Sequence, residues 1–146
     1  YKILKMETME KTVITVESTI DAPIEKVWET WTKAEHITEW CAASDDWHAP
    51  KAENDVRVGG SFSTRMEAKD GSFGFDFGGV YDAVRINEYM EYTMGDGRKV
   101  QITFTSHGNK THVVESFEAE STNPIEMQKG GWQAILDNFK KYSEAI

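Results

Sequence analysis

The sequence has a single cysteine, few prolines and no long apolar run. Cys41 is the only cysteine among 146 residues, which excludes an internal disulfide, a cysteine-rich zinc site and a CxxC redox motif. No apolar run approaches the roughly 20 residues of a membrane span, and no signal-peptide pattern is visible. We therefore expect a cytoplasmic protein without a membrane partner.

Positive charge is also scarce. The chain has 16 lysines and arginines against 25 aspartates and glutamates, which gives a formal net charge of -9. A field of this sign repels the phosphates of nucleic acids and anionic lipid surfaces. The charge balance therefore predicts no nucleic-acid partner and again no membrane partner.

Aromatic residues, in contrast, are abundant, with 5 Trp, 5 Tyr and 7 Phe. Large flat side chains close a hydrophobic core, and they also line apolar pockets. The length of the chain suits one domain with one core. We assign this domain to residues 12–146 and interpret residues 1–11, whose patterning is weak, as an N-terminal lead-in or a cloning remnant.

Residues 123–146 have the pattern of one long helix. Asn123 suits the N-cap, and Pro124 suits the first turn, where its missing N–H costs nothing. The glycines at positions 130 and 131 lie inside this helix and predict either a close approach to a sheet or a kink. An apolar stripe at helical spacing requires a broad apolar partner. Its members are Trp132, Ile135, Leu136, Phe139, Tyr142 and Ile146.

The rest of the chain shows strand and turn patterns with two short helices. Residues 12–20 alternate as a strand, and residues 23–32 and 33–40 have the apolar spacing of helices. Residues 41–54 show little periodicity and contain Pro50, so we predict a loop there.

From residue 55 to residue 120, strand patterns alternate with turns. The pair Gly78–Gly79 indicates a bulge or a sharp bend. Short hairpin links predict a curved antiparallel sheet of six to seven strands. Together with the terminal helix, this sheet makes an α+β fold.

Several segments resemble a known family. Residues 55–62, DVRVGGSF, are similar to its DxRxGGxF segment, and residues 75–81, FDFGGVY, are similar to its FxxxGxY strand. Residues 117–120, 123–124 and 131–139 resemble the closing motif of the branch named after the activator of the heat-shock chaperone ATPase (AHSA-like). This branch belongs to the START-related superfamily, also called SRPBCC or Bet v-like. The resemblance implies a helix-grip fold, in which a curved sheet wraps around the long C-terminal helix.

A helix laid across a curved sheet leaves a space that becomes a cavity when bulky side chains fill it incompletely. Members of the superfamily bind apolar small molecules or act as cyclases or hydrolases, so the resemblance implies such a cavity here. The alternative is that the same side chains simply pack the core. The candidates for the lining are Trp40, Trp47, Phe62, Met66, Phe73, Phe75, Phe77, Tyr92, Phe104, Phe117, Trp132, Leu136 and Phe139.

Glu115 is the polar candidate. Val113, Glu115 and Phe117 share one face of a predicted strand, so Glu115 points inward if Phe117 does. A buried carboxyl group needs a partner or a raised pKa, and it could then orient a ligand or act as a general base. The alternative is that the opposite face, with Val114 and Ser116, is inward and Glu115 is solvated.

The remaining motif searches give no metal or cofactor site. The four histidines, at positions 36, 48, 107 and 112, are scattered, and no pair has zinc-ligand spacing. The paired glycines lack the spacing of dinucleotide or P-loop sites, and Cys41 has no evident histidine–asparagine set to activate it. We therefore expect no metal and no organic cofactor.

These patterns favour a protein that binds a small hydrophobic or amphipathic molecule between the sheet and the terminal helix. One alternative is a cyclase- or hydrolase-type enzyme that uses a cavity carboxylate, with Glu115 as the candidate. The other is a chaperone-associated interaction module. The expected partner is accordingly a small apolar molecule, and the alternatives are a chaperone or a second copy of the chain in a homodimer.

Overall fold

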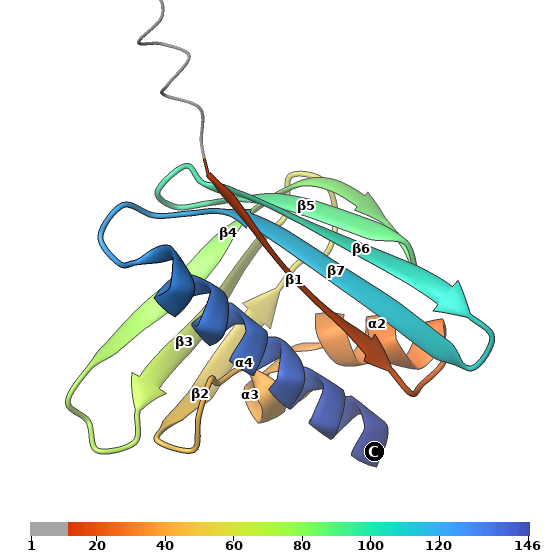
Figure 1. The fold of residues 1–146 in the computed structure, drawn as a ribbon, viewed down its shortest axis with the longest axis horizontal. Helices are drawn as coiled ribbons and strands as arrows, with labels where there is room; N and C mark the ends of the chain where they lie inside the picture. The colour runs from red at the N-terminus through yellow and green to blue at the C-terminus, as the bar shows by residue number, and fades with distance from the viewer. Residues whose placement is uncertain (1–11) are drawn as a thin grey trace, which may run out of the picture.

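The computed structural model describes residues 12–146, which form one seven-stranded antiparallel sheet and three helices (Figure 1). The strand order is β1-β7-β6-β5-β4-β3-β2. The predicted α+β helix-grip fold is confirmed, whereas the interpretation of residues 1–11 lies outside the described residues. The elements are β1 (Val13–Ile20), α2 (Ile24–Thr32), α3 (Ala34–Trp40), β2 (Trp47–Asn54), β3 (Ser61–Ala68), β4 (Gly74–Arg85), β5 (Tyr89–Met94), β6 (Lys99–His107), β7 (Lys110–Glu118) and α4 (Ile125–Ala145).

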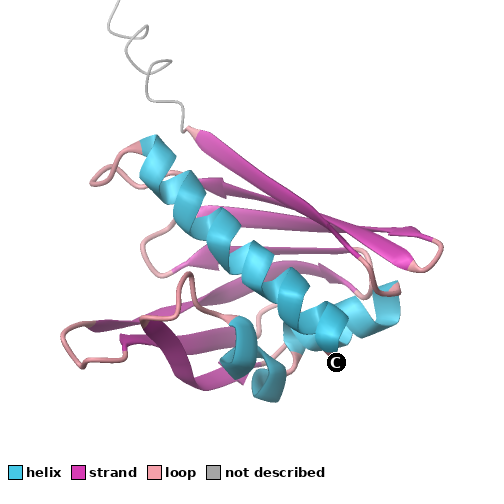
Figure 2. Cartoon of the chain, turned by 60° about the horizontal axis from the view of Figure 1, so that its bottom comes forward, coloured by secondary structure: helices cyan, strands magenta, loops and turns pink. Residues whose placement is uncertain are grey.

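The sheet curls, and α4 crosses its concave side (Figure 2). The C-terminal part of α4 lies near α2 and α3, and the helix packs mainly against β1. Two α4 side chains donate hydrogen bonds to main-chain carbonyls of this edge strand: Gln133 Nε2 to Glu17 O at 3.2 Å and Lys140 Nζ to Thr19 O at 2.8 Å. The helix is thus held against one edge of the sheet, and the concave face extends away from it toward β2.

The inner face of the sheet follows the alternation of its strands. On β7, every second residue from Thr111 to Phe117 is buried, and β1 and β6 supply buried residues directly opposite. These side chains and the inner faces of the helices form one core cluster. The two-residue period therefore decides which residues can reach the space beneath α4.

The loop predicted for residues 41–54 is wrong for its second half, because residues 47–54 form β2. This strand pairs only with β3, and its register shifts between His48 and Lys51, around Pro50. Proline lacks a backbone N–H and is tolerated on an edge strand, where no further ladder bond is needed. Because most β2 side chains are exposed or half-buried, the strand also lacks the apolar alternation that would have predicted it.

The irregularity predicted at Gly78–Gly79 lies slightly further along the chain. β4 pairs with β3 without interruption through both glycines, and its register against β5 shifts between Tyr81 and Ala83. Glycine is required at position 79 for another reason, since a Cβ atom there would lie 2.4 Å from the Thr93 carbonyl oxygen. The glycine pair therefore marks close strand packing, and Phe75 and Phe77 keep the same face as predicted.

Helix α4 differs from the prediction at its start and at its glycines. Pro124 is the N-cap, whereas the Asn123 side chain donates a hydrogen bond to Glu120 Oε2 at 2.6 Å. The helix continues unbroken through Gly130 and Gly131 (Figure 2). A Cβ atom at either glycine would meet nothing within 4 Å, so the predicted close approach to the sheet is wrong.

Candidate functional site

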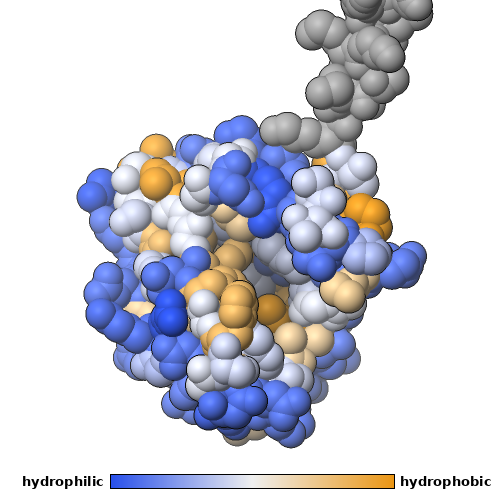
Figure 3. All heavy atoms as spheres, turned by 90° about the vertical axis from the view of Figure 1, so that its left-hand side faces the viewer, coloured by the Kyte–Doolittle hydropathy of each residue, from blue (hydrophilic) through white to orange (hydrophobic). Residues whose placement is uncertain are grey.

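A cavity of about 330 Å³ lies between the first half of α4 and the inner face of the sheet. Its size falls at the lower end of the range of small-molecule sites, roughly 300–1,000 Å³. Figure 3 shows the face of the molecule where α4 begins, with apolar side chains in a hollow and hydrophilic residues around it. The lining consists of Trp31, Trp40, Met66, Phe75, Phe77, Arg98, Glu115, Glu120, Gln128, Trp132 and Ile135.

Five of the eleven lining residues are aromatic, and contacts with neighbouring groups hold several of these rings in place. The indole N–H of Trp40 donates to the Thr30 carbonyl oxygen at 2.9 Å, which leaves the ring itself without a free donor. Trp132 stacks on Phe117 with the ring centroids 3.8 Å apart and the planes 11° apart. Phe77 meets Trp132 edge-on at 5.9 Å. These rings are fixed by packing, so the wall is preformed.

Glu115 lies on the inner face of β7 between Val113 and Phe117, and it lines the cavity. Its neighbours across the sheet are the buried apolar residues Val16 and Ile102. The Glu115 residue is only 6% exposed, and no group among residues 12–146 forms a hydrogen bond or an ion pair with its carboxyl group. The carboxyl group is therefore a buried polar group that only a cavity occupant or water can satisfy.

Burial controls the ionisation of this region. It raises the pKa of Glu115 to about 8, because the ionised carboxylate is poorly solvated there. It also raises the pKa of Cys41 to about 12 and that of Tyr92 well above its ordinary value, and the charge of Glu115 adds to both shifts. At neutral pH, Glu115 is thus the one of these three groups that can exist in either protonation state, so it can donate or accept a hydrogen bond.

The other charged residues of the lining already have partners. Arg98 Nε donates to Asp96 Oδ2 at 2.8 Å, and Arg98 Nη1 donates to the Glu118 carbonyl oxygen at 3.1 Å. The Glu120 carboxylate accepts hydrogen bonds from the backbone N–H groups of Thr122 and Asn123 at 2.5 and 2.8 Å, and these bonds lower its pKa.

Gln128 closes the end of the cavity near the start of α4. Its amide nitrogen donates to the carbonyl oxygens of Glu120 and Asn123 at 3.0 and 2.8 Å, and its amide oxygen accepts from the Glu120 N–H at 2.9 Å. Gln128 thereby fastens the connection between β7 and α4. A ligand entering at this end would meet an ordered polar rim.

The structure brings only part of the predicted lining to this cavity. Five of the aromatic and apolar candidates line it together with Glu115. Two others, Phe62 and Tyr92, border a small adjoining space of about 50 Å³ that shares Trp31 and Trp40 with the cavity. The five candidates that line the cavity are Trp40, Met66, Phe75, Phe77 and Trp132. Four others pack in the core: Phe104, Phe117, Leu136 and Phe139.

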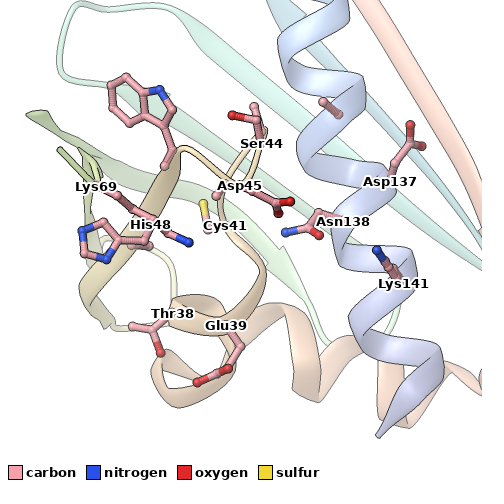
Figure 4. A pocket seen from close by; sticks show the side chains of 15 residues that line it. Thr38, Glu39, Cys41, Ser44, Asp45, His48, Lys69, Asp137, Asn138 and Lys141 are labelled. Atoms are coloured by element: carbon pink, nitrogen blue, oxygen red, sulfur yellow. The ribbon is translucent and has the colours of Figure 1, made fainter. Parts of the chain in front are cut away.

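Trp47 and Phe73 lie outside the cavity. Phe73 lies in the turn of the hairpin between β3 and β4 and is 62% exposed, and the centroid of its ring is 6.0 Å from that of Trp47. Trp47 instead borders a more open groove of about 670 Å³ between α4 and the segment joining α3 to β2 (Figure 4). Polar side chains such as Asp45, Asp137 and Lys141 surround this groove, so it lacks the apolar wall of the cavity.

Several lining residues were not among the candidates, and some of them had a sequence signal. Trp31 and Ile135 belong to the apolar stripes predicted for their helices. Gln128 precedes Trp132 by one helical turn, so it continues the α4 stripe as a polar residue. Arg98 follows a turn and carries no pattern that would have indicated its position.

The described residues offer neither a metal site nor a membrane-spanning helix. No group of three or more histidine, cysteine, aspartate or glutamate side chains within residues 12–146 is arranged to hold a metal ion. No helix in the same range has both the length and the apolar character of a membrane span.

Comparison with known proteins identifies the family. The family model described as Activator of Hsp90 ATPase homolog 1-like protein matches residues 21–144. The chain belongs to this family. The AHSA-like resemblance predicted from the motifs is therefore confirmed. No curated protein matches the AHSA1-like chain.

Solved structures agree with this assignment. The solution structure of the AHSA1-like protein from Aeromonas hydrophila is 44% identical, with a TM-score of 0.86 over 92% of this chain and 93% of that chain. A protein from Cytophaga hutchinsonii is 59% identical, with a TM-score of 0.79 over 90% of this chain and 92% of that chain. A protein from Chromobacterium violaceum, at 22% identity and a TM-score of 0.79 over 90% of this chain and 96% of that chain, shows the fold alone.

Proposed function

We propose that this AHSA1-like chain binds a small amphipathic molecule in the cavity beneath the first half of α4. The observation that carries the proposal is a preformed aromatic wall facing one buried carboxyl group, Glu115, that has no partner within the described chain. Apolar walls with a few placed polar groups are the usual construction of small-molecule sites. The apolar part of the ligand would lie against Trp40 and Trp132, and its polar group would satisfy Glu115.

The ligand is expected to be mostly apolar because the walls gain most from excluding water. Burial of apolar surface contributes about 25 cal/mol per Å², so even a compact aromatic molecule would gain several kcal/mol before the costs of binding. One unsatisfied carboxyl group then selects among such molecules, since leaving a buried polar group unpaired costs about 1–3 kcal/mol.

A variant in which a larger side chain fills the cavity tests this proposal. Ile135→Trp places a larger side chain into the lining, whereas Ile125→Trp makes the same change on the exposed start of the same helix. Native mass spectrometry of the purified protein, and thermal shift with a panel of aromatic amphiphiles, should show bound ligand for the parent and the Ile125 variant. The Ile135 variant should have lost it. Equal ligand retention by both variants would refute binding in this cavity.

The raised pKa of Glu115 favours a second candidate, an enzyme with Glu115 as general acid or base. A carboxyl group with a pKa of about 8 is well matched to proton transfer near neutral pH. Glu115→Gln keeps the shape of the side chain and removes its proton chemistry. Once a ligand is identified, turnover that falls at least 100-fold in this variant, with ligand affinity retained, would support the enzyme. Ligand recovered chemically unchanged after prolonged incubation with the parent would refute it.

A further inference from the structure

The chemical class of the ligand can be argued from the groups that surround the unpaired carboxyl group. Val16, Ile102 and Phe117 supply no donor, and the titratable neighbours Cys41 and Tyr92 are neutral. No positive side chain within residues 12–146 forms an ion pair with the Glu115 carboxyl group. A ligand that brings its own donor or positive charge is therefore complementary to Glu115.

The aromatic wall has the same preference. The electron-rich faces of tryptophan rings attract cations and disfavour anions. Trp31, Trp40 and Trp132 all line the cavity, and Phe75 and Phe77 complete the wall on the sheet side. Because the N–H of Trp40 is already bonded to a carbonyl oxygen, that ring has no donor left for an anion.

The charged residues at the rim do not reverse this preference. Arg98 is the only positive side chain of the lining, and Asp96 and a carbonyl oxygen already accept its hydrogen bonds. Glu120 adds a carboxylate to the lining, which balances the charge of Arg98. The net charge of -9 also favours the approach of a cation over that of an anion.

We infer that the ligand is a hydrophobic amine that binds as its ammonium ion, with Glu115 as the counter-ion and the tryptophan faces as the surrounding cage. This inference rests on the proposed function, since it assumes that the cavity holds a small molecule. It adds the charge of that molecule, which the apolar wall alone does not determine.

The inference has a proton balance that a neutral ligand does not share. In the free protein at pH 7, Glu115 carries its proton, because its pKa is about 8. Binding of an ammonium ion breaks the Glu115 O–H bond, and the proton passes to the buffer, while the ligand keeps its own charge. An uncharged ligand that accepts a hydrogen bond from the carboxyl group releases no proton. Cys41 and Tyr92 stay neutral and Glu120 stays ionised in both cases.

Three probes with one apolar body separate the charge states: naphthylethylamine, naphthylethanol and naphthylacetate. Isothermal titration calorimetry at pH 7, in buffers with different ionisation enthalpies, measures both affinity and proton release. We expect the amine to bind at least 10-fold more tightly than the alcohol and the acetate to bind most weakly. Binding of the amine should release about 0.9 proton, the fraction of Glu115 protonated one pH unit below its pKa.

Two variants and a control assign the effect to Glu115. Glu115→Gln, and Glu115→Met in case the amide is poorly tolerated, should lower amine affinity to that of the alcohol and abolish proton release. The exposed Glu53→Gln on β2 makes the same chemical change away from the cavity and should alter neither.

The outcomes separate the inference from the proposed function. If the alcohol or the acetate binds as tightly as the amine and Ile135→Trp abolishes this binding, the inference that the ligand is an amine is overturned. The cavity then remains a ligand site. A preference for the amine that survives in both Glu115 variants would also overturn the inference. If none of the three probes binds the parent and no small molecule is retained through purification, the proposed function fails together with the inference.

Discussion

The two halves of α4 cover the same sheet in opposite ways. In the second half, Leu136, Phe139 and Ser143 are almost completely buried, and Phe139 meets Trp31 and Trp40 edge-on at 4.7 and 4.9 Å. The first half has one buried side chain, Gln128, which is polar. Of its apolar residues, Trp132 and Ile135 border the cavity, and Ile125 and Met127 are 43% and 61% exposed.

This difference between the halves explains why a cavity remains beneath the first half of α4. Large apolar residues in the second half fill the space between helix and sheet. In the first half, Gln128, Trp132 and Ile135 border this space without filling it. The cavity therefore lies where the side chains of α4 are polar or only half-buried, and the packed half fixes the helix beside it.

The largest expected effect comes from opening the packed half. Phe139→Ala should destabilise the protein by about 3–5 kcal/mol, because it removes a fully buried ring from a close-packed core. Trp132→Ala should cost roughly half as much, since Trp132 is half-buried and already borders empty space. Urea denaturation measures both. Equal losses for the two variants would mean that the halves are packed alike.

The next effect concerns the pH dependence that the cavity imposes. Because the pKa of Glu115 is raised in the folded state, folding takes up a proton between the ordinary carboxyl pKa and about pH 8. The stability that this group contributes is present at low pH, falls by about 3–4 kcal/mol between pH 5 and pH 8, and levels off above that range. The difference in unfolding free energy between Glu115→Gln and the parent should therefore grow in favour of the variant from pH 5 to pH 8. A difference that is independent of pH would contradict the buried, unpaired carboxyl group.

A smaller effect is expected at the rim. Gln128→Ala removes three hydrogen bonds to the segment between β7 and α4 and should destabilise the protein by about 1–3 kcal/mol. Amide hydrogen exchange should accelerate in residues 119–130 and remain unchanged around Phe139. Acceleration spread evenly along α4 would show that the two halves open together and would remove the distinction between them.

The smallest effect tests the glycines. Gly130→Ala should stabilise the protein by about 0.5–1 kcal/mol, because alanine favours the helix and a Cβ atom there meets no neighbour. Gly131→Ala should behave alike, and thermal melting of the single and double variants measures both. A loss of stability would indicate that the backbone at this point needs the freedom of glycine.

Much of the fold was predictable because periodicity reports burial directly. The two-residue alternation of β7 and the stripe of α4 predicted a strand and a helix with one inner face each, but the alternation left open whether the Glu115 or the Val114 side of β7 is inward. β2 escaped prediction because an edge strand with Pro50 and mostly exposed side chains has no alternation to detect. The sequence pattern thus describes the buried parts of the sheet better than its margin.

The site was less predictable than the fold. Periodicity distinguishes inner from outer faces, but it does not separate side chains that border a cavity from those that fill the core, such as Phe104 and Phe139. Phe73 has the parity of Phe75 and Phe77, yet it lies beyond the end of the curved sheet, where the inner face no longer has a partner. Arg98 reaches the cavity from a turn, and only the three-dimensional path of the chain reveals this.

The way in which the two edge strands, β1 and β2, end the sheet has a consequence for aggregation. An open sheet margin is a template on which a foreign strand can add, and repeated addition leads to fibrils. Here the carbonyl oxygens of Glu17 and Thr19 are taken by side chains of α4, and at the opposite margin Pro50 and the shifted register interrupt the ladder. Neither side therefore presents an unbroken row of free backbone groups, and a foreign strand finds no continuous ladder to extend.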